Sequence, residues 1–391
     1  MNISTDVDRP FLPPQDSALT GEVAIDPGRQ QGATTRQIAI VVDTSGSMSG
    51  EKIDRAIEGA KYVLGYLEDD DYLTLVGFDA TATTVIDAEQ YGSMTRDSVV
   101  DQIEALSTGG GTDIYAALEQ AKEQLDSLPG GPDTAKRILL LSDGKDNRRG
   151  PEDFDEQARR IDESGIRIRA GGIGSDYNME TIRTLGTVAR GEWEHIEQAS
   201  EIQQFLGRGV EEAATVVGTD AELRMDIAEG VEFTEVYRAR PQVQEVDVEY
   251  EGDNLAVVKL PDLKDREDQE VRMKIRAPGH DPGEEVTLAD VTLNAAGETA
   301  EDDITVEYTE DNDKLGVRRE DVSIGLDEVR TRIEAGRGNV EEAQTQVENM
   351  RTKYGDDAAN LDDLEDTVTE VAEGGRAEQS GATKIDDGDR L

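Results

Sequence analysis

The chain has 391 residues, of which 88 are acidic and 40 basic, so its formal net charge is −48 and its length allows two or three domains. A negative charge of this size argues against a protein that binds nucleic acid or anionic membranes, because both partners require basic surfaces. The sequence holds no cysteine, which excludes disulfides and thiolate metal sites. It also lacks an apolar run of the roughly 20 residues that a membrane helix needs, and its start, MNISTDVDRPFLPPQ, has no signal-peptide pattern. We therefore expect a soluble, cytoplasmic protein.

The first 35 residues (1–35) are predicted to form a β-rich arm. Residues 21–25 alternate in polarity as a half-buried strand does, but the segment is too short to fold alone. We expect the arm to cross the domain that follows it and to pack with a β-sandwich further along the chain.

Residues 36–216 are predicted to form an α/β domain. Residues 38–42 are a continuous run of apolar, mostly β-branched side chains, as in a strand buried on both faces of a parallel sheet. Strand and helix patterns then alternate, with strands expected at 72–78, 83–87, 137–141, 166–173 and 192–196 and helices near 51–67, 96–106, 112–125, 152–163, 178–189 and 200–214. This alternation predicts a doubly wound, mostly parallel sheet of the Rossmann-like kind.

The pattern changes after the α/β domain. Residues 217–310 hold short segments that alternate apolar and charged side chains between turns, which predicts an antiparallel β-sandwich. Residues 316–373 repeat apolar side chains every three or four positions and are predicted to form a helical hairpin or bundle. The polar residues 374–391 are expected to be a disordered tail.

Three short polar segments of the α/β domain carry groups that can bind a metal ion. Asp43, Ser45 and Ser47 follow the first buried strand. Thr112 follows three glycines at the start of a helix, and Asp143 follows the strand at 137–141. Loops at the carboxyl ends of parallel strands meet, and carboxylate and hydroxyl oxygens suit a hard cation such as Mg²⁺. The alternative is that these residues only cap the next helix and form an ordinary glycine turn.

The same five residues resemble the metal-ion-dependent adhesion site of von Willebrand factor type A (VWA) domains. The segments DTSGSMSGEKID, GGGTDIYAAL and ILLLSDGKDN carry the resemblance. It implies that Ser45 and Ser47 coordinate the ion through their hydroxyls and that Thr112 does so directly or through water. Asp43 and Asp143 would act mostly through water or hydrogen bonds. The resemblance also implies an open coordination position that an Asp or Glu of a partner protein fills, with Mg²⁺ as the expected ion and Ca²⁺ or Mn²⁺ as alternatives.

Catalytic groups are not evident around this site. Ser45 stands where phosphatases of the haloacid-dehalogenase type carry a second Asp, and neither a phosphate loop nor a dinucleotide fingerprint follows a strand. The two histidines, His195 and His280, are expected to lie near no partner that could serve catalysis. We therefore expect no enzyme, and metal-assisted hydrolysis is the least favoured alternative. Some nearby acids are expected either to surround the ligands or to be ordinary loop and helix-start residues, namely Asp79, Asp113 and Asp146.

The layout of arm, VWA domain, β-sandwich and helices resembles a group of prokaryotic VWA proteins. The acidic composition resembles that of haloarchaeal proteins, whose surfaces stay hydrated in a salt-rich cytosol. The resemblance implies a cytoplasmic adaptor or scaffold in a complex with an ATPase, a protein kinase or a phosphatase. The alternative is a structural or assembly protein whose β-sandwich and helices make the main contacts, with the metal site secondary.

Overall fold

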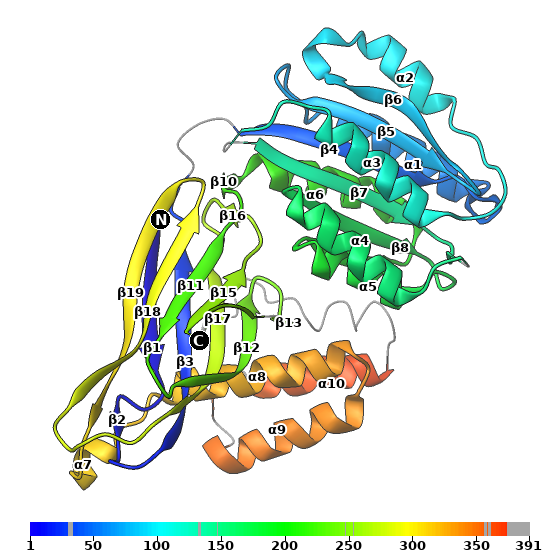
Figure 1. The fold of residues 1–391 in the computed structure, drawn as a ribbon. Coiled ribbons are helices and arrows are strands. Elements are labelled where there is room, and N and C mark those ends of the chain that lie inside the picture. The colour runs from blue at the N-terminus through cyan, green and yellow to red at the C-terminus, as the bar shows by residue number, and fades with distance from the viewer. Residues whose placement is uncertain are drawn as a thin grey trace. The chain divides into compact units, whose positions relative to one another are not determined.

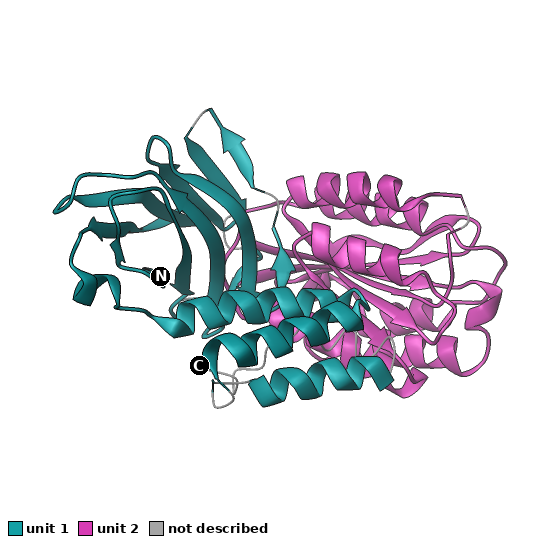
Figure 2. Ribbon diagram, turned by 90° about the horizontal axis from the view of Figure 1, so that it is seen from below, with its two compact units in different colours: residues 1–29, 220–391 teal, residues 30–219 magenta. Residues whose placement is uncertain are grey.

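The computed structural model describes residues 1–29, 34–131, 134–146, 148–246, 248–252, 254–355, 358 and 361–373. The chain forms two compact units, one of residues 30–219 and one that joins residues 1–29 to residues 220–391 (Figure 2). The tail predicted at 374–391 lies outside the described residues. Within the described ranges, every helix is too short or too polar to cross a membrane.

The unit of residues 30–219 is built on a six-stranded sheet with the order β6-β5-β4-β7-β8-β9 (Figure 1). Neighbouring strands are parallel except for the edge pair of β5 and β6. The predicted α/β fold with a mostly parallel sheet is therefore confirmed. The strands are β4 (Thr35–Asp43), β5 (Tyr72–Phe78), β6 (Ala82–Gln90), β7 (Thr134–Ser142), β8 (Ile166–Ile173) and β9 (Glu192–Ile196), and the short β10 (Val216–Gly218) closes the unit.

Helices cover both faces of this sheet, and β4 supplies side chains to both cores. Ile38, Ile40 and Val42 pack under the helices of one face, whereas Ala39 and Val41 pack under those of the other. The first face carries α1 (Glu51–Val63), α2 (Arg96–Glu104) and α6 (Ile202–Ala214), and the second carries α3 (Ile114–Asp126), α4 (Pro151–Glu163) and α5 (Met179–Val188). Short 3₁₀ turns lie at Gly46–Met48 (η1), Tyr91–Ser93 (η2) and Ala199–Glu201 (η3).

The other unit contains two largely antiparallel sheets. The five-stranded sheet has the order β1-β3-β17-β12-β13, formed by β1 (Asn2–Val7), β3 (Ser17–Asp26), β17 (Gln269–Ala277), β12 (Glu232–Arg240) and β13 (Gln244–Glu245). The six-stranded sheet has the order β14-β15-β11-β18-β19-β2, formed by β14 (Glu249–Glu251), β15 (Leu255–Lys259), β11 (Glu222–Ile227), β18 (Glu285–Ala295), β19 (Glu298–Tyr308) and β2 (Phe11–Leu12). β16 (Leu263–Lys264) is a further short strand. Residues 17–25 of the N-terminal segment pair antiparallel with β17, in a register that sets Ile25 opposite Gln269.

The C-terminal segment is helical. It begins with the single turn α7 (Asn312–Leu315) and continues with α8 (Glu320–Gly336), α9 (Val340–Tyr354) and α10 (Leu361–Glu373). The last three helices share one apolar core, to which Ala335, Val347 and Leu364 contribute. Val329 and Ile333 of α8 pack instead on the residues that end β12 and follow it, so this helix ties the bundle to the five-stranded sheet.

Candidate metal centre

Three loops meet at the carboxyl ends of β4 and β7. These strands are parallel neighbours with Val42 opposite Leu141, so Asp43 and Asp143 leave the same edge of the sheet. The glycine loop before α3 joins them, because the amide of Gly109 donates to the carbonyl oxygen of Thr44 at 2.7 Å. Residues that are about 100 positions apart in the sequence are thereby brought together, as the topology of a parallel sheet requires.

Hydrogen bonds connect the polar side chains of two of these loops. The hydroxyls of Ser45 and Ser47 lie 3.0 Å apart, and Ser47 Oγ donates to Asp143 Oδ1 at 2.7 Å. The backbone amide of Ser45 donates to Asp43 Oδ1 at 2.8 Å. Four of the five candidate ligands therefore belong to one connected group.

Thr112, the fifth candidate ligand, lies beside Gly144. A Cβ atom at Gly144 would lie 2.8 Å from Thr112 Oγ1 and 3.3 Å from Asp43 Oδ2. The Thr112 hydroxyl and the Asp43 carboxylate thus border the same point of the backbone. The structure brings all five candidate ligands to one place, and a side chain at Gly144 would require a neighbouring group such as Thr112 to shift.

The carboxylates of the site are deeply buried while some hydroxyls face solvent. Asp43 is 0% exposed and Asp143 1% exposed, whereas Ser47 is exposed and Thr112 is half-buried. Burial raises the pKa of Asp43 above its usual range, and hydrogen bonds from Ser142 and Ser45 oppose this shift. Ser142 Oγ donates to Asp43 Oδ2 at 2.6 Å. Positive charge is therefore favoured beside these buried carboxylates, and it can be approached from the Ser47 side.

Lys52, which is not among the candidate residues predicted from the sequence, also belongs to this site. Its ammonium contacts Asp143 Oδ2, and its side chain is 34% exposed. The signal in the sequence is a basic residue in the first turn of a helix, directly after the Asp43–Ser47 segment. Acidic residues are the ones usually favoured at that end of a helix.

The neighbouring acids hold the loops in shape. Asp113 caps α3 by accepting from the amide of Ala116 at 3.0 Å, and its other oxygen accepts from Arg148 at 2.5 Å. Asp79 accepts from the amide of Thr81 at 3.0 Å. One oxygen of Asp146 accepts from the amide of Arg148, while the other is buried without a hydrogen-bond partner among the described residues.

The donor groups fit a hard divalent cation. Two carboxylates and three hydroxyls supply oxygen atoms, which suit Mg²⁺, Mn²⁺ or Ca²⁺. Within the described part of the chain, His, Cys, Asp and Glu side chains nowhere gather in threes at metal-binding distance, so the hydroxyls are essential to any coordination here. An ion held mainly by neutral hydroxyls keeps much of its positive charge.

Both histidines, which we expected to lie near no partner that could serve catalysis, have a polar neighbour in the structure. His195 Nδ1 lies 2.9 Å from the hydroxyl of Tyr177, and His280 Nδ1 lies 3.3 Å from Glu284 Oε2. The sequence could not show the contact of His195, because Tyr177 approaches it from the loop after the neighbouring strand β8. Both interactions are with residues outside the three loops of the metal centre.

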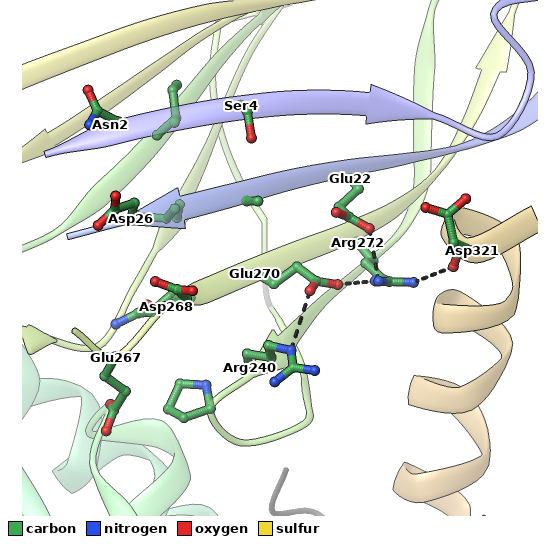
Figure 3. A pocket seen from close by; sticks show the side chains of 15 residues that line it. Asn2, Ser4, Glu22, Asp26, Arg240, Glu267, Asp268, Glu270, Arg272 and Asp321 are labelled. Atoms are coloured by element: carbon green, nitrogen blue, oxygen red, sulfur yellow. Dashed lines mark hydrogen bonds and ion pairs between the residues drawn. The ribbon is translucent and has the colours of Figure 1, made fainter. Parts of the chain in front are cut away.

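A hollow of about 510 Å³ lies on the five-stranded sheet of the other unit (Figure 3). Arg272 pairs there with Glu22 at 2.8 Å, and Arg240 pairs with Glu270 at 3.6 Å. Burial raises the pKa of Glu22 to about 7, although the charge of Arg272 opposes the shift. Figure 3 shows both guanidinium groups turned towards carboxylates of the hollow itself. The positive charges of Arg240 and Arg272 are therefore paired with acidic residues of the same unit.

A model of the von Willebrand factor type A domain family matches residues 37–207. The chain is similar to an uncharacterised protein of Synechocystis sp., with 24% identity over 253 residues that cover 64% of this chain and 59% of that protein. It is also similar to inter-alpha-trypsin inhibitor heavy chain H2 of Mus musculus, with 28% identity over 196 residues that cover 44% of this chain and 20% of the other. The chain thus spans less than two thirds of the length of these relatives.

Two solved structures share the fold over almost the whole chain. A von Willebrand factor type A protein from Catenulispora acidiphila matches with a TM-score of 0.78 and 19% identity, covering 99% of this chain and 94% of that one. VWA2, the ArnB paralog from Sulfolobus acidocaldarius, matches with a TM-score of 0.66 and 17% identity, covering 98% and 96%. The α/β unit and the β-rich unit with its C-terminal helices therefore occur together in other proteins.

Proposed function

We propose that residues 37–207, which form a von Willebrand factor type A domain, bind a partner protein through a divalent cation. Ser45, Ser47 and Thr112 provide hydroxyl ligands in this proposal, and Asp43 and Asp143 balance the charge. An Asp or Glu side chain of the partner completes the coordination. The protein acts as a cytoplasmic adaptor or scaffold, and an ATPase, a kinase or a phosphatase is the class of partner we suggest.

The connected group of Ser45, Ser47, Asp43 and Asp143 is the observation that carries this proposal. Its hydrogen bonds span two loops and use both oxygens of Asp43, so the group is held in a fixed arrangement. Preorganised oxygen donors of this type favour binding of a hard cation, because little side-chain freedom is lost when the ion arrives.

The arrangement favours recognition by a carboxylate. When bound, a divalent cation supplies concentrated positive charge at the edge of the sheet. Among the described residues, Asp43 and Asp143 are the two carboxylates of the centre, and both are buried, whereas Ser47 is exposed. A carboxylate of a partner can approach from that exposed side, and its negative charge is attracted to an ion whose ligands are mostly neutral.

Two alternatives have less support. In the first, the β-rich unit and the helices make the main contacts, and the metal is secondary. In the second, the centre catalyses metal-assisted hydrolysis. Hydrolysis needs a base near the ion, and the contacts of His195 and His280 turn both towards residues outside the centre. A phosphatase assay with Mg²⁺ or Mn²⁺ checks this alternative, and turnover that is lost on Asp43→Ala would support it.

Affinity capture with the full chain as bait tests the proposal. Extract of the source cells is passed over wild-type protein in Mg²⁺ and in EDTA, and over a variant that combines Ser45→Ala with Ser47→Ala. Ser49→Ala is the matched control, because Ser49 is an exposed serine beside the centre whose hydroxyl bonds to Thr108 at 3.0 Å. We expect a partner that is retained by the wild type and by Ser49→Ala in Mg²⁺ and is released by EDTA.

Capture that survives both EDTA and the double variant would refute the metal-dependent mode and favour contacts made by the β-rich unit. Fractionation of the source cells tests the cytoplasmic location separately, and recovery of the protein outside the cytoplasm would contradict that part of the proposal.

A further inference from the structure

Lys52 lies against the metal centre although its place in the helix disfavours a positive charge. It is the second residue of α1, whose first turn otherwise carries the acids Glu51 and Asp54. The amino end of a helix is partly positive, so a lysine there needs a nearby negative partner. Asp143 is that partner, because its Oδ2 contacts the Lys52 ammonium.

Asp143 is shared between Lys52 and the proposed ligands. Its side chain is fully buried, and its other oxygen accepts from Ser47 Oγ at 2.7 Å. The loop after β8 borders the ammonium as well, because a Cβ at Gly174 would lie 4.0 Å from Lys52 Nζ. A positive group of this chain is therefore already held at the carboxylate that a divalent ion would use.

We propose that Lys52 is a built-in counter-cation of the metal centre, which lowers its affinity for a divalent ion and leaves positive charge for a partner's carboxylate. This inference rests on the function proposed above. Asp43 and Asp143 together balance the charge of a divalent ion. Lys52 then leaves one positive charge in excess, and a single carboxylate from the partner cancels it.

The two effects of Lys52 have opposite signs. Without the ion, the ammonium offsets the negative charge of Asp143, which would otherwise be buried without a cationic partner. With the ion bound, two positive groups stand beside one carboxylate and repel each other. Loss of the Lys52 charge should therefore lower the stability of the metal-free protein and raise its affinity for the ion.

Titration calorimetry of MgCl₂ into metal-free full-length protein tests this inference. We expect Lys52→Met to bind Mg²⁺ roughly ten- to a hundredfold more tightly than the wild type, because the repulsion is removed. Lys61→Met is the matched control: Lys61 lies on the same helix, its side chain is 32% exposed, and it pairs at 2.8 Å with Glu104, which is not one of the proposed ligands. Lys61→Met and the charge-conserving Lys52→Arg should bind Mg²⁺ like the wild type.

Thermal unfolding provides a second measurement that a merely structural role for Lys52 would not reproduce. In EDTA the melting temperature of Lys52→Met should lie below that of the wild type, while its rise on addition of Mg²⁺ should be larger. A packing role alone would lower both melting temperatures together. Lys52→Gln, which also lacks the charge, replaces Lys52→Met in both experiments if the latter does not fold.

The outcomes separate the inference from the function it rests on. If the wild type binds Mg²⁺ and the neutral variants bind it no more tightly, the role of Lys52 is wrong and the metal-dependent function stands. If neither the wild type nor the neutral variants bind Mg²⁺ or Mn²⁺, both proposals fail. Binding by the neutral variants alone would support the inference strongly.

Discussion

Replacing Gly144 with alanine adds one methyl group to the wall of the metal centre without removing any proposed ligand. The new Cβ would lie 2.8 Å from Thr112 Oγ1 and 3.3 Å from Asp43 Oδ2. Unstrained contacts lie near 3.5 Å, so Thr112 or the backbone must move by roughly 0.7 Å, which exceeds the ~0.5 Å that a preorganised site tolerates. Overpacking of this kind costs about 1–3 kcal/mol, and every 1.4 kcal/mol is tenfold in affinity. We expect Mg²⁺ affinity to fall by roughly ten- to a hundredfold.

Titration calorimetry with MgCl₂ measures this effect directly. Gly110→Ala is the matched control, because Gly110 belongs to a loop of the same centre and a Cβ there would meet no atom within 4 Å. It should bind Mg²⁺ like the wild type. If Gly144→Ala folds normally by circular dichroism and retains wild-type affinity, the ion does not bind between Thr112 and Asp43, and the reasoning is refuted.

Three further predictions concern stability. Ser142→Ala removes the hydroxyl that donates to the buried carboxylate of Asp43, so the free energy of unfolding, measured with urea in EDTA, should fall by about 2 kcal/mol. Ser127→Ala is the control, because this serine is exposed, and it should change the free energy little. Equal effects of the two substitutions would contradict the prediction. The raised pKa of Glu22 means that the folded state holds more protons than the unfolded state between pH 4.5 and about 7, so wild-type stability should fall as pH rises through this window, by at most about 3 kcal/mol. Glu22→Gln should lack this loss, and a stability difference from the wild type that is the same at pH 5 and pH 8 would contradict the shift. The net charge of the chain is −48, so its acidic side chains repel one another. Raising KCl from about 0.1 to 1 M screens this repulsion over distances beyond ~3 Å and should therefore raise the melting temperature. An unchanged or lower melting temperature would count against an adaptation to salt.

The central strands could be predicted from the sequence because a strand buried on both faces leaves a continuous apolar run, as residues 38–42 do. The edge strand β6 extends from Ala82 to Gln90, beyond the predicted 83–87, because its half-exposed side chains give no such run. Residues 243–250 have the alternation of one strand. In the structure β13 pairs with β12, whereas β14 pairs with β15 in the other sheet. Alternation reports which side chains are exposed, but it does not report which strand supplies the hydrogen bonds.

The candidate ligands could be found because strand ends and glycine loops are visible as motifs. Their partners could not, since these depend on how loops from distant parts of the sequence pack. Lys52 contacts Asp143 because α1 begins after β4, whose parallel neighbour β7 ends next to Asp143. Asp113 carries a carboxylate that could lie near the ion, yet one of its oxygens caps α3 and the other pairs with Arg148. The sequence identifies the groups with suitable chemistry, and the fold decides which of them face one another.

The most direct test of the account is an anomalous difference map from crystals of the protein equilibrated with Mn²⁺. We predict a strong peak within coordination distance of the hydroxyls of Ser45 and Ser47, next to Thr112, with an open position towards solvent. A map that shows no peak there at saturating Mn²⁺ would contradict the claim that this centre holds a cation for a partner to bind.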